Sequence, residues 1–224
     1  MLEPLLKELA PAQIVPVDLS ACIVMDLTAE NRELAKIDPA DTKAFNAYVE
    51  AAARSQGKQY SIGRYQEDRC IYRMSGLFSG DEQPRSIHIG LDIWVPSGTP
   101  VLAAYDGQVH SFQDNANFGD YGPTIIVSHW TKGVSWHTLY GHLTRESLLN
   151  LAVGTEVRRG DMIARVGESH ENGNWPSHLH FQIIRNMGEW RGDYPGVCSP
   201  EDREYYLENC PDPNLLLGLA ALRN

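Results

Sequence analysis

The stretch IHIGLDI, residues 87–93, alternates apolar side chains with histidine, glycine and aspartate. Such alternation predicts a half-buried β-strand, because neighbouring side chains of a strand point to opposite faces. His88 and Asp92 would then lie roughly 13 Å apart along an extended strand. Two ligands of one metal ion cannot be that far apart, because each lies about 2 Å from the ion. If both bind one ion, the strand bends between them, and Gly90 is placed to form the bulge or kink.

A second motif, SHLHFQI, covers residues 177–183. His178 and His180 are two positions apart on a predicted strand, so both imidazoles face one side and lie roughly 7 Å apart. One ring can bind a metal there while the other reaches the metal's water or a substrate. Two structural histidines facing solvent are the alternative. Leu179 and Phe181, which face a core, argue against it.

A third motif, TLYGHL, covers residues 138–143 and places His142 at the end of an apolar strand. A lone histidine in such a position is more often structural than catalytic. The case for a functional His142 therefore depends on the other two motifs. His137 lies close by in the sequence. The spacing alone leaves the choice between His137 and His142 open.

Short β-rich runs separated by Gly, Pro, Asp and Asn fill the chain from about residue 87. Their regular spacing is typical of an antiparallel sandwich or a barrel-like sheet, so we predict a mainly β fold. The expected strands are Pro100–Ala104, Gly107–Phe112, Thr124–His129, Val134–Tyr140, Thr155–Val157, Met162–Val166 and Leu179–Ile184.

The first 60 residues have a helical character instead. Asp38 and Pro39 offer a cap followed by proline at the first helical position, and residues 42–56 place apolar side chains on one face. Residues 60–73 are dense in Arg, Tyr and acidic side chains, which predicts an exposed hairpin or edge with salt bridges. The alternative is a wall that faces the substrate. The tail from Trp190 ends in LLLGLAALR, which we expect to pack back as an apolar anchor.

The chain is therefore expected to have three parts. Residues 1–84 form an N-terminal helical segment with a connecting hairpin, residues 85–190 form the β domain, and residues 191–224 form the tail. Four cysteines without a CxxC pair predict reduced structural thiols. Cys198 and Cys210 are the one pair close enough in sequence to examine for a disulfide.

The composition excludes some functions. A formal net charge of -10 without a basic run disfavours nucleic acid as a partner, since binding to a phosphate backbone depends on Lys and Arg clusters. No stretch approaches the roughly 18 apolar residues of a membrane span. The N-terminus has neither the basic nor the continuous apolar region of a secretory signal, so we expect a cytoplasmic protein.

The ordered motifs together resemble the zinc metallopeptidases of the lysostaphin and LytM type, many of which cut peptidoglycan cross-bridges. The resemblance covers roughly residues 85–186. It comprises HIGLD (88–92), GTPV (98–101), DGQV (106–109), DYG (120–122), TLYGHL (138–143), GTEV (154–157), IARVG (163–167) and SHLHFQI (177–183). So many elements in order are far more specific than any single motif.

The resemblance implies that His88, Asp92 and His180 bind one zinc ion per chain and that His142 and His178 are the catalytic pair. It implies an open antiparallel β-sandwich of the duplicated hybrid motif type. Two histidines and one aspartate leave a fourth tetrahedral position for water, as catalytic zinc sites require. Because no HExxH glutamate is present, a histidine has to take the proton. Which histidine does so stays open.

The chain also departs from the family. Many members carry a tyrosine shortly before the first ligand, and residues 76–87 contain none. Arg85, Tyr65 and Tyr72 are candidates to replace it, and Tyr140 is a further candidate for substrate contact. The flanks RYQEDRCIY (64–72) and DYPGVCSPEDREYY (193–206) resemble a peptidase-like segment sometimes joined to aminotransferases or kinases, whose substrate cannot be inferred. Peptidoglycan is therefore the family's default substrate.

The favoured hypothesis is a zinc-dependent metalloendopeptidase acting on peptidoglycan or another short peptide. One alternative is a non-hydrolytic binding or regulatory module that uses the same groove. Another is metal-dependent hydrolysis of a non-peptide amide. The complete set of five histidine and aspartate positions favours the enzyme over the binding module.

Overall fold

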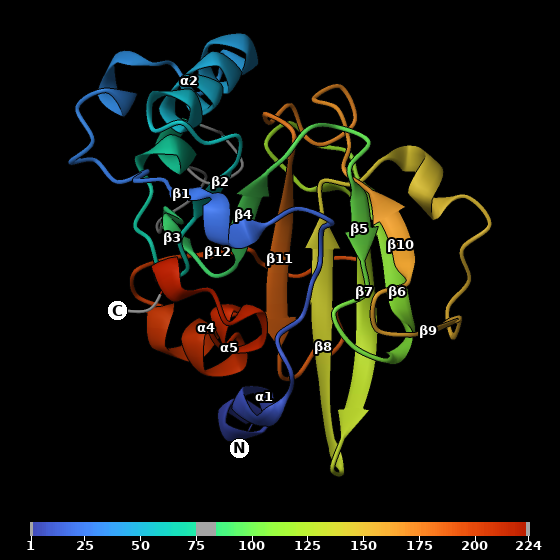
Figure 1. Ribbon diagram of the computed structural model, residues 1–224. Helices are drawn as coiled ribbons and strands as arrows, with labels where there is room; N and C mark the ends of the chain where they lie inside the picture. The colour runs from blue at the N-terminus through green and yellow to red at the C-terminus, as the bar shows by residue number, and fades with distance from the viewer. Residues whose placement is uncertain (1, 75–83, 223–224) are drawn as a thin grey trace.

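The computed structural model describes residues 2–74 and 84–222 (Figure 1). Its strands are β1 (Ile23–Val24), β2 (Ser61–Gly63), β3 (Ile87–His88), β4 (Leu91–Trp94), β5 (Pro100–Leu102), β6 (Gly107–Asn115), β7 (Gly122–Thr131), β8 (Val134–Gly141), β9 (Glu156–Val157), β10 (Met162–Arg165), β11 (His178–Ile184) and β12 (Val197–Cys198). Its helices are α1 (Leu2–Glu8), α2 (Thr42–Ser55), α4 (Arg203–Asn209) and α5 (Asn214–Leu217). Short 3-10 helices lie at Leu19–Ala21, Leu34–Lys36, Cys70–Met74, Arg145–Leu148 and Ala220–Leu222.

Among the described residues, eight strands form one open sheet in the order β1-β2-β4-β11-β8-β7-β6-β9. Neighbouring strands are antiparallel except for β1 and β2, which are parallel. Two short antiparallel pairs, β5–β10 and β3–β12, lie beside this sheet. The predicted mainly β fold with open antiparallel sheets is confirmed.

Strand β11 positions the site. It runs between β4 and β8 and is buried along its whole length. Leu179 and Phe181 belong to the main hydrophobic core, so His178 and His180 point to the opposite face of the sheet. The register places His180 directly opposite Asp92 on β4. Backbone pairing thus brings together two candidate ligands that are 88 residues apart.

The predicted bend in the first motif is present. Strand β3 ends at His88, and β4 begins after Gly90. His88 pairs with β12, whereas Asp92 pairs with β11, so the two ends of the motif belong to different sheets. The break at Gly90 lets both side chains turn into one space, which an unbroken strand could not do.

The predicted helix at residues 42–56 is confirmed as α2. Its N-cap is Asp41 rather than Asp38, because the Asp41 carboxylate accepts hydrogen bonds from the backbone N–H groups of Lys43 and Ala44. The rest of the first 60 residues contains α1, short 3-10 helices and β1 rather than a longer helix. Phe45 and Val49 bury the inner face of α2 in a second core beside the sheet.

The prediction of an exposed hairpin at residues 60–73 is wrong. Strand β2 lies inside the large sheet, between β1 and β4. Glu67 is 6% exposed and Arg69 is fully buried. The two charges tolerate burial because each has an ionic partner, and the partner that the sequence could not reveal is Asp92, 23 residues further along.

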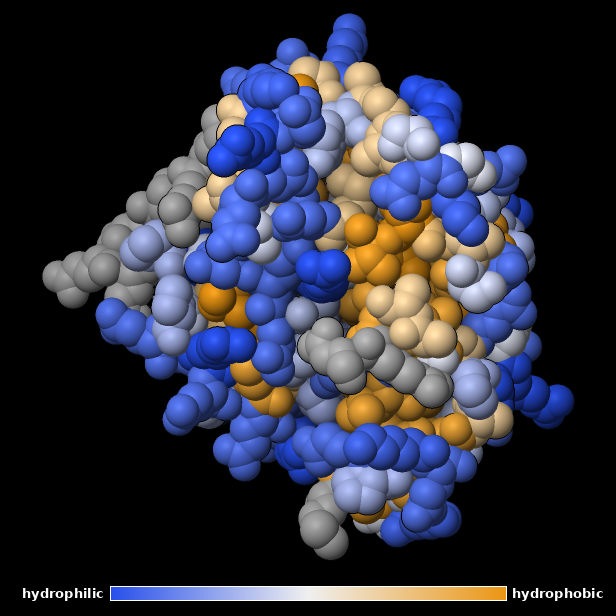
Figure 2. Space-filling model, turned by 60° about the vertical axis from the view of Figure 1, so that its left-hand side comes forward, coloured by the Kyte–Doolittle hydropathy of each residue, from blue (hydrophilic) through white to orange (hydrophobic). Residues whose placement is uncertain are grey.

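Part of the tail packs on the main core. Leu216 and Leu217 of α5 are buried in the main core together with Leu2, Leu5 and Leu6 of α1. Figure 2 turns this side of the molecule forward and shows an apolar hollow surrounded by hydrophilic residues. The four cysteines are free thiols, as expected. Within the described residues, no helix has the length and apolar character that crossing a membrane requires.

Candidate active site

Three candidate ligand atoms converge on one point. His88 Nε2 lies 3.1 Å from His180 Nδ1 and 3.3 Å from Asp92 Oδ1, and the last two atoms are 3.0 Å apart. All three side chains are buried. Ligands about 2.0–2.1 Å from a tetrahedral zinc ion are separated by about 3.3–3.4 Å, so this triangle fits the face that three protein ligands present to zinc.

Backbone and side-chain acceptors fix which nitrogen of each ring faces the triangle. His88 Nδ1 donates to the Arg64 carbonyl at 3.0 Å, which leaves Nε2 as the ligand atom. His180 Nε2 donates to Gln182 Oε1 at 3.0 Å, which leaves Nδ1 as the ligand atom. Acceptors of this kind orient metal-binding histidines in general.

The charge state of the ligands also suits a divalent cation. Burial lowers the pKa of His88 to about 4, so the ring is neutral near pH 7. Burial alone would raise the pKa of Asp92, but His88 and the Arg69 guanidinium hold it well below its usual range. Arg69 donates from Nη1 to Asp92 Oδ2 on the side of the carboxylate away from the histidines.

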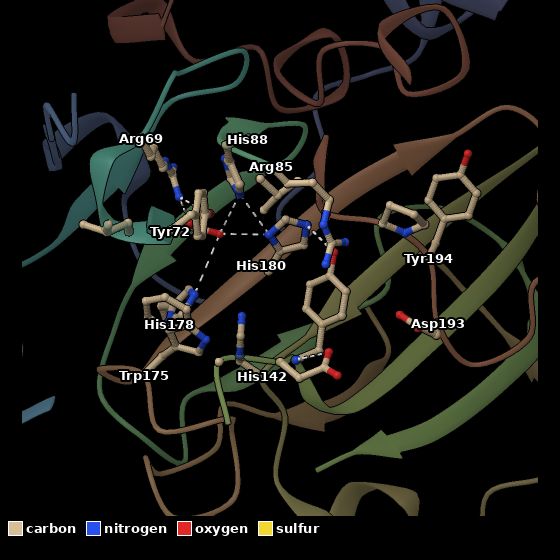
Figure 3. Close-up of a pocket in the computed structure, with 18 of the residues that line it drawn as sticks. Arg69, Tyr72, Arg85, His88, His142, Trp175, His178, His180, Asp193 and Tyr194 are labelled. Atoms are coloured by element: carbon tan, nitrogen blue, oxygen red, sulfur yellow. Dashed lines mark hydrogen bonds and ion pairs between the residues drawn. The ribbon is translucent and has the colours of Figure 1, made fainter. Parts of the chain in front are cut away.

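His142 and His178 lie next to the triangle (Figure 3). Their ring centroids are 4.1 Å apart, and His178 Nε2 is 3.8 Å from Asp92 Oδ1. His178 Nδ1 donates to the Pro176 carbonyl at 2.7 Å, and His142 Nδ1 donates to the Asn172 carbonyl at 2.9 Å. In both rings Nε2 therefore carries the free lone pair. Burial lowers the pKa of both, so both are neutral proton acceptors at pH 7.

His142 has a strained backbone, with a φ of 62° in the left-handed region. A residue with a side chain pays about 1–2 kcal/mol for this conformation. The conformation is held in place because the His142 N–H donates to the Tyr121 carbonyl at 2.9 Å. Such strain is often found at functional positions, where the surrounding structure fixes the side chain in one orientation.

The candidate ligands and histidines line a cavity of about 170 Å³. One wall comes from the N-terminal part of the chain, through Phe45, Ile71 and Tyr72. On the other side lie Arg85 and Asp193. Residues 1–84, expected as a separate helical segment, therefore contribute directly to the site.

Some of the residues expected to contact substrate line the cavity and others do not. Arg85 lines the cavity, as does Tyr72. Tyr140 is fully buried on the core side, where its hydroxyl accepts from the Ala104 N–H, and the Tyr65 hydroxyl donates to the Cys210 carbonyl. Neither Tyr65 nor Tyr140 lines the cavity, so we correct the expectation that they contact substrate. On β8 the side chains alternate, which turns Tyr140 toward the core.

Arg69 also lines the cavity and belongs to residues 60–73, for which a wall facing the substrate was the alternative, whereas sequence reasoning missed Tyr121 and Trp175. Tyr121 lies in the DYG element, the one available signal for it. Its ring fits only because two neighbours are glycines, since a Cβ at Gly141 or Gly196 would collide with it. The Tyr121 hydroxyl lies 3.4 Å from His180 Nε2, which is the ring nitrogen that does not face the ligand triangle.

We expect Gly90→Ala to weaken the binding of a metal at this site, tested with zinc, by about 10- to 100-fold, the usual cost of disturbing the support of a ligand. A Cβ at this position would lie 2.5 Å from His180 Cε1 and 2.6 Å from Nε2, so the ring would have to move. Zinc affinity is measured by competition with a chelator. Gly154→Ala is the control for a general loss of stability, because its Cβ meets nothing within 4 Å and its cost comes from the backbone φ of 85°. Wild-type affinity in Gly90→Ala would show that the close approach is not needed.

Comparisons with known proteins match the part of the chain that contains the site. Residues 86–191 match the sequence model of peptidase family M23. The chain is 36% identical over 100 residues to the DD-carboxypeptidase/endopeptidase Mpg of Neisseria meningitidis serogroup B, covering 45% of this chain and 20% of that protein. It is 29% identical over 121 residues to the peptidoglycan DD-endopeptidase ShyA of Vibrio cholerae, covering 52% of this chain and 25% of that protein.

Among solved structures, the catalytic domain of lysostaphin from Staphylococcus simulans is 25% identical, with a TM-score of 0.39, over 53% of this chain and 79% of that domain. The part of the chain that matches covers about a fifth of the length of the Neisseria relative and a quarter of the length of the Vibrio relative. The family match begins at the residue before the IH of the first motif and contains all five histidine and aspartate positions of the site. Residues 86–191 of this chain are therefore a domain of peptidase family M23.

Proposed function

We propose that this chain is a zinc-dependent endopeptidase that hydrolyses an amide bond in peptidoglycan or in another short peptide. The observation that carries the proposal is the triangle formed by His88 Nε2, Asp92 Oδ1 and His180 Nδ1, with sides of 3.0–3.3 Å. Three protein ligands with an open fourth position are the usual arrangement of catalytic zinc sites.

His88, Asp92 and His180 would hold the ion. When bound, zinc supplies a Lewis acid that polarises the scissile carbonyl and lowers the pKa of water toward about 7. Zinc is favoured over the hard cations because two of the three donors are imidazoles, whereas magnesium and calcium prefer oxygen ligands.

His142 and His178 are the general acid–base residues of the proposed reaction. Each keeps an Nε2 lone pair because its Nδ1–H is donated to a backbone carbonyl. One ring accepts the proton of the attacking water at Nε2 and, once protonated, can donate it to the leaving amine, whereas the other ring can accept a hydrogen bond from that water. Burial keeps both rings neutral before the reaction, which leaves Nε2 free to accept.

The cavity supports a short peptide as the substrate. A cavity of about 170 Å³ beside the candidate ligands can hold the groups around one amide bond. Phe45 and Trp175, whose ring centroids are 6.5 Å apart, form an apolar wall beside the ligands. Peptidoglycan is favoured within this class because the relatives from Neisseria and Vibrio are named as endopeptidases, the latter of peptidoglycan.

The test is a screen of the zinc-loaded wild type and His178→Ala on muropeptides and on a peptide library, with products identified by mass spectrometry. We expect cleavage by the wild type at one type of bond and a loss of about 10²–10⁴-fold in rate for His178→Ala. Wild type that holds zinc but cleaves none of these amides would contradict the proposal. Equal cleavage by both proteins would remove His178 from the mechanism.

A further inference from the structure

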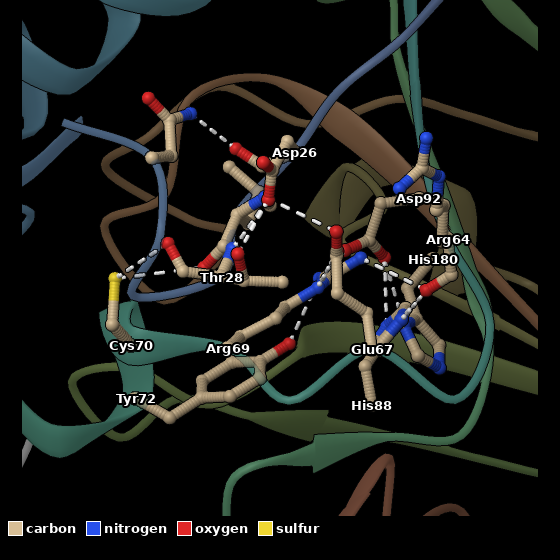
Figure 4. Close-up of polar contacts among 12 residues, drawn as sticks. Asp26, Thr28, Arg64, Glu67, Arg69, Cys70, Tyr72, His88, Asp92 and His180 are labelled. Atoms are coloured by element: carbon tan, nitrogen blue, oxygen red, sulfur yellow. Dashed lines mark hydrogen bonds and ion pairs between the residues drawn. The ribbon is translucent and has the colours of Figure 1, made fainter. Parts of the chain in front are cut away.

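Arg69 lies outside residues 86–191 yet contacts Asp92, one of the candidate metal ligands. It follows β2 in the segment before residue 86, and no part of its side chain is exposed. Its guanidinium donates from Nη1 to Asp92 Oδ2 and to the Tyr72 hydroxyl at 3.0 Å, and from Nε to Glu67 Oε2 at 2.9 Å (Figure 4). A buried arginine with this many partners is held in a single position.

We propose that Arg69 is a positioning residue that keeps Asp92 a one-oxygen ligand. Oδ1 is the oxygen that faces His88 and His180, at 3.3 and 3.0 Å. Oδ2 is occupied by the guanidinium. With Oδ2 held in this way, the carboxylate cannot rotate to present both oxygens to the same ion.

This restriction matters for the open position of the site. Carboxylates can bind a cation with one oxygen or with two. A second oxygen from Asp92 would fill the place that a catalytic zinc site keeps for water or substrate. The inference rests on the proposed function, because it concerns the coordination of the same ion.

Arg69 supports a second ligand through the backbone. Its Nη2 donates to the Arg64 carbonyl at 3.4 Å, the same oxygen that accepts from His88 Nδ1 at 3.0 Å. One guanidinium thus fixes the carboxylate directly and shares the acceptor that orients His88. Only the planar fork of an arginine reaches these groups at once, since a lysine offers a single charged nitrogen.

Two neighbours make room for Arg69 and balance its charge. Gly63 lies against the guanidinium, and a Cβ there would collide with Nη2. Glu67 offsets the positive charge, and its other oxygen accepts from the Leu27 N–H at 3.1 Å. Because Glu67 and Arg69 together are neutral, the pair can orient Asp92 without adding a net charge beside the metal.

The test replaces Arg69 with lysine, which keeps the charge and loses the fork. We expect Arg69→Lys to bind zinc about 10- to 100-fold more weakly in a chelator competition, the range for such supporting residues. With cobalt in place of zinc, the visible absorption should weaken as coordination rises from four to five. Arg145→Lys is the matched control, because Arg145 also pairs with an aspartate, Asp114, but at the surface. Wild-type affinity and spectrum in Arg69→Lys would overturn the inference.

A second variant serves as the test if the Arg69→Lys protein does not fold. The double variant Glu67→Gln/Arg69→Gln removes one buried charge of each sign, so the net charge of the cluster with Asp92 stays the same. Its cobalt complex should show the same weakening of the visible absorption. The zinc-loaded wild type gives an independent check by crystallography, where Asp92 bound through both oxygens would also overturn the inference. If wild type binds no zinc, the proposed function fails instead, so the two failures are distinguishable.

Discussion

Asp92→Ala is expected to lose bound zinc and with it all hydrolytic activity. Asp92 supplies the one anionic donor of the candidate triangle, and no other carboxylate among the described residues lies in that cluster. The same change removes one of the two buried carboxylates that pair with Arg69, so it should also lower the stability of the fold, although Glu67 still compensates the guanidinium. Metal analysis after dialysis measures the first effect, and thermal unfolding in chelator measures the second.

The two effects are separated by the response to zinc. A ligand that binds the folded state stabilises it by about 4 kcal/mol when its concentration is 1,000 times Kd. Zinc should therefore raise the melting temperature of wild type and leave that of Asp92→Ala unchanged. Asp114→Ala is the matched control, because it breaks an exposed pair with Arg145 that contributes at most about 1 kcal/mol. Full zinc occupancy in Asp92→Ala would refute the ligand assignment.

His142→Ala is expected to keep its zinc and to lose turnover by about 10²–10⁴-fold, the usual contribution of general acid–base catalysis. His142 contributes no atom to the ligand triangle, and its ring lies beside His178. Steady-state rates on the substrate found in the screen and metal content on the same sample measure both effects.

Two comparisons make this result interpretable. His142→Asn removes the imidazole with a residue that tolerates the φ of 62°, so a loss shared with alanine cannot come from backbone strain. His170→Ala is the control, because its side chain is 69% exposed and does not line the cavity. Wild-type turnover in both His142 variants would return His142 to a structural role.

Local patterns predicted much of the fold. The strands after residue 100 follow from alternating apolar residues and turn residues, and the structure contains each of them with shifts of a few positions. The bend at Gly90 follows from the ligand spacing, since His88 and Asp92 could meet on one ion only if the strand broke. These features depend on neighbouring residues, which a sequence displays.

Long-range partners explain what was missed. Arg69 looks like a surface residue because its segment is rich in charges, and nothing nearby in the sequence shows that Asp92 accepts its hydrogen bond. Tyr140 precedes His142 by two, yet only His142 lines the cavity, because the positive φ of His142 breaks the alternation expected of a strand. Tertiary contacts and backbone irregularities of this kind cannot be derived from local periodicity.

The placement of β11 in the centre of the sheet has a consequence for biosynthesis. Its residues leave the ribosome about 40 positions after β8 is complete, yet they form the backbone bridge between β8 and β4. Until then the nascent chain presents two unpaired edges, which are templates for association with other chains. The three candidate ligands can therefore meet only after β11 has emerged, because His180 lies on that strand.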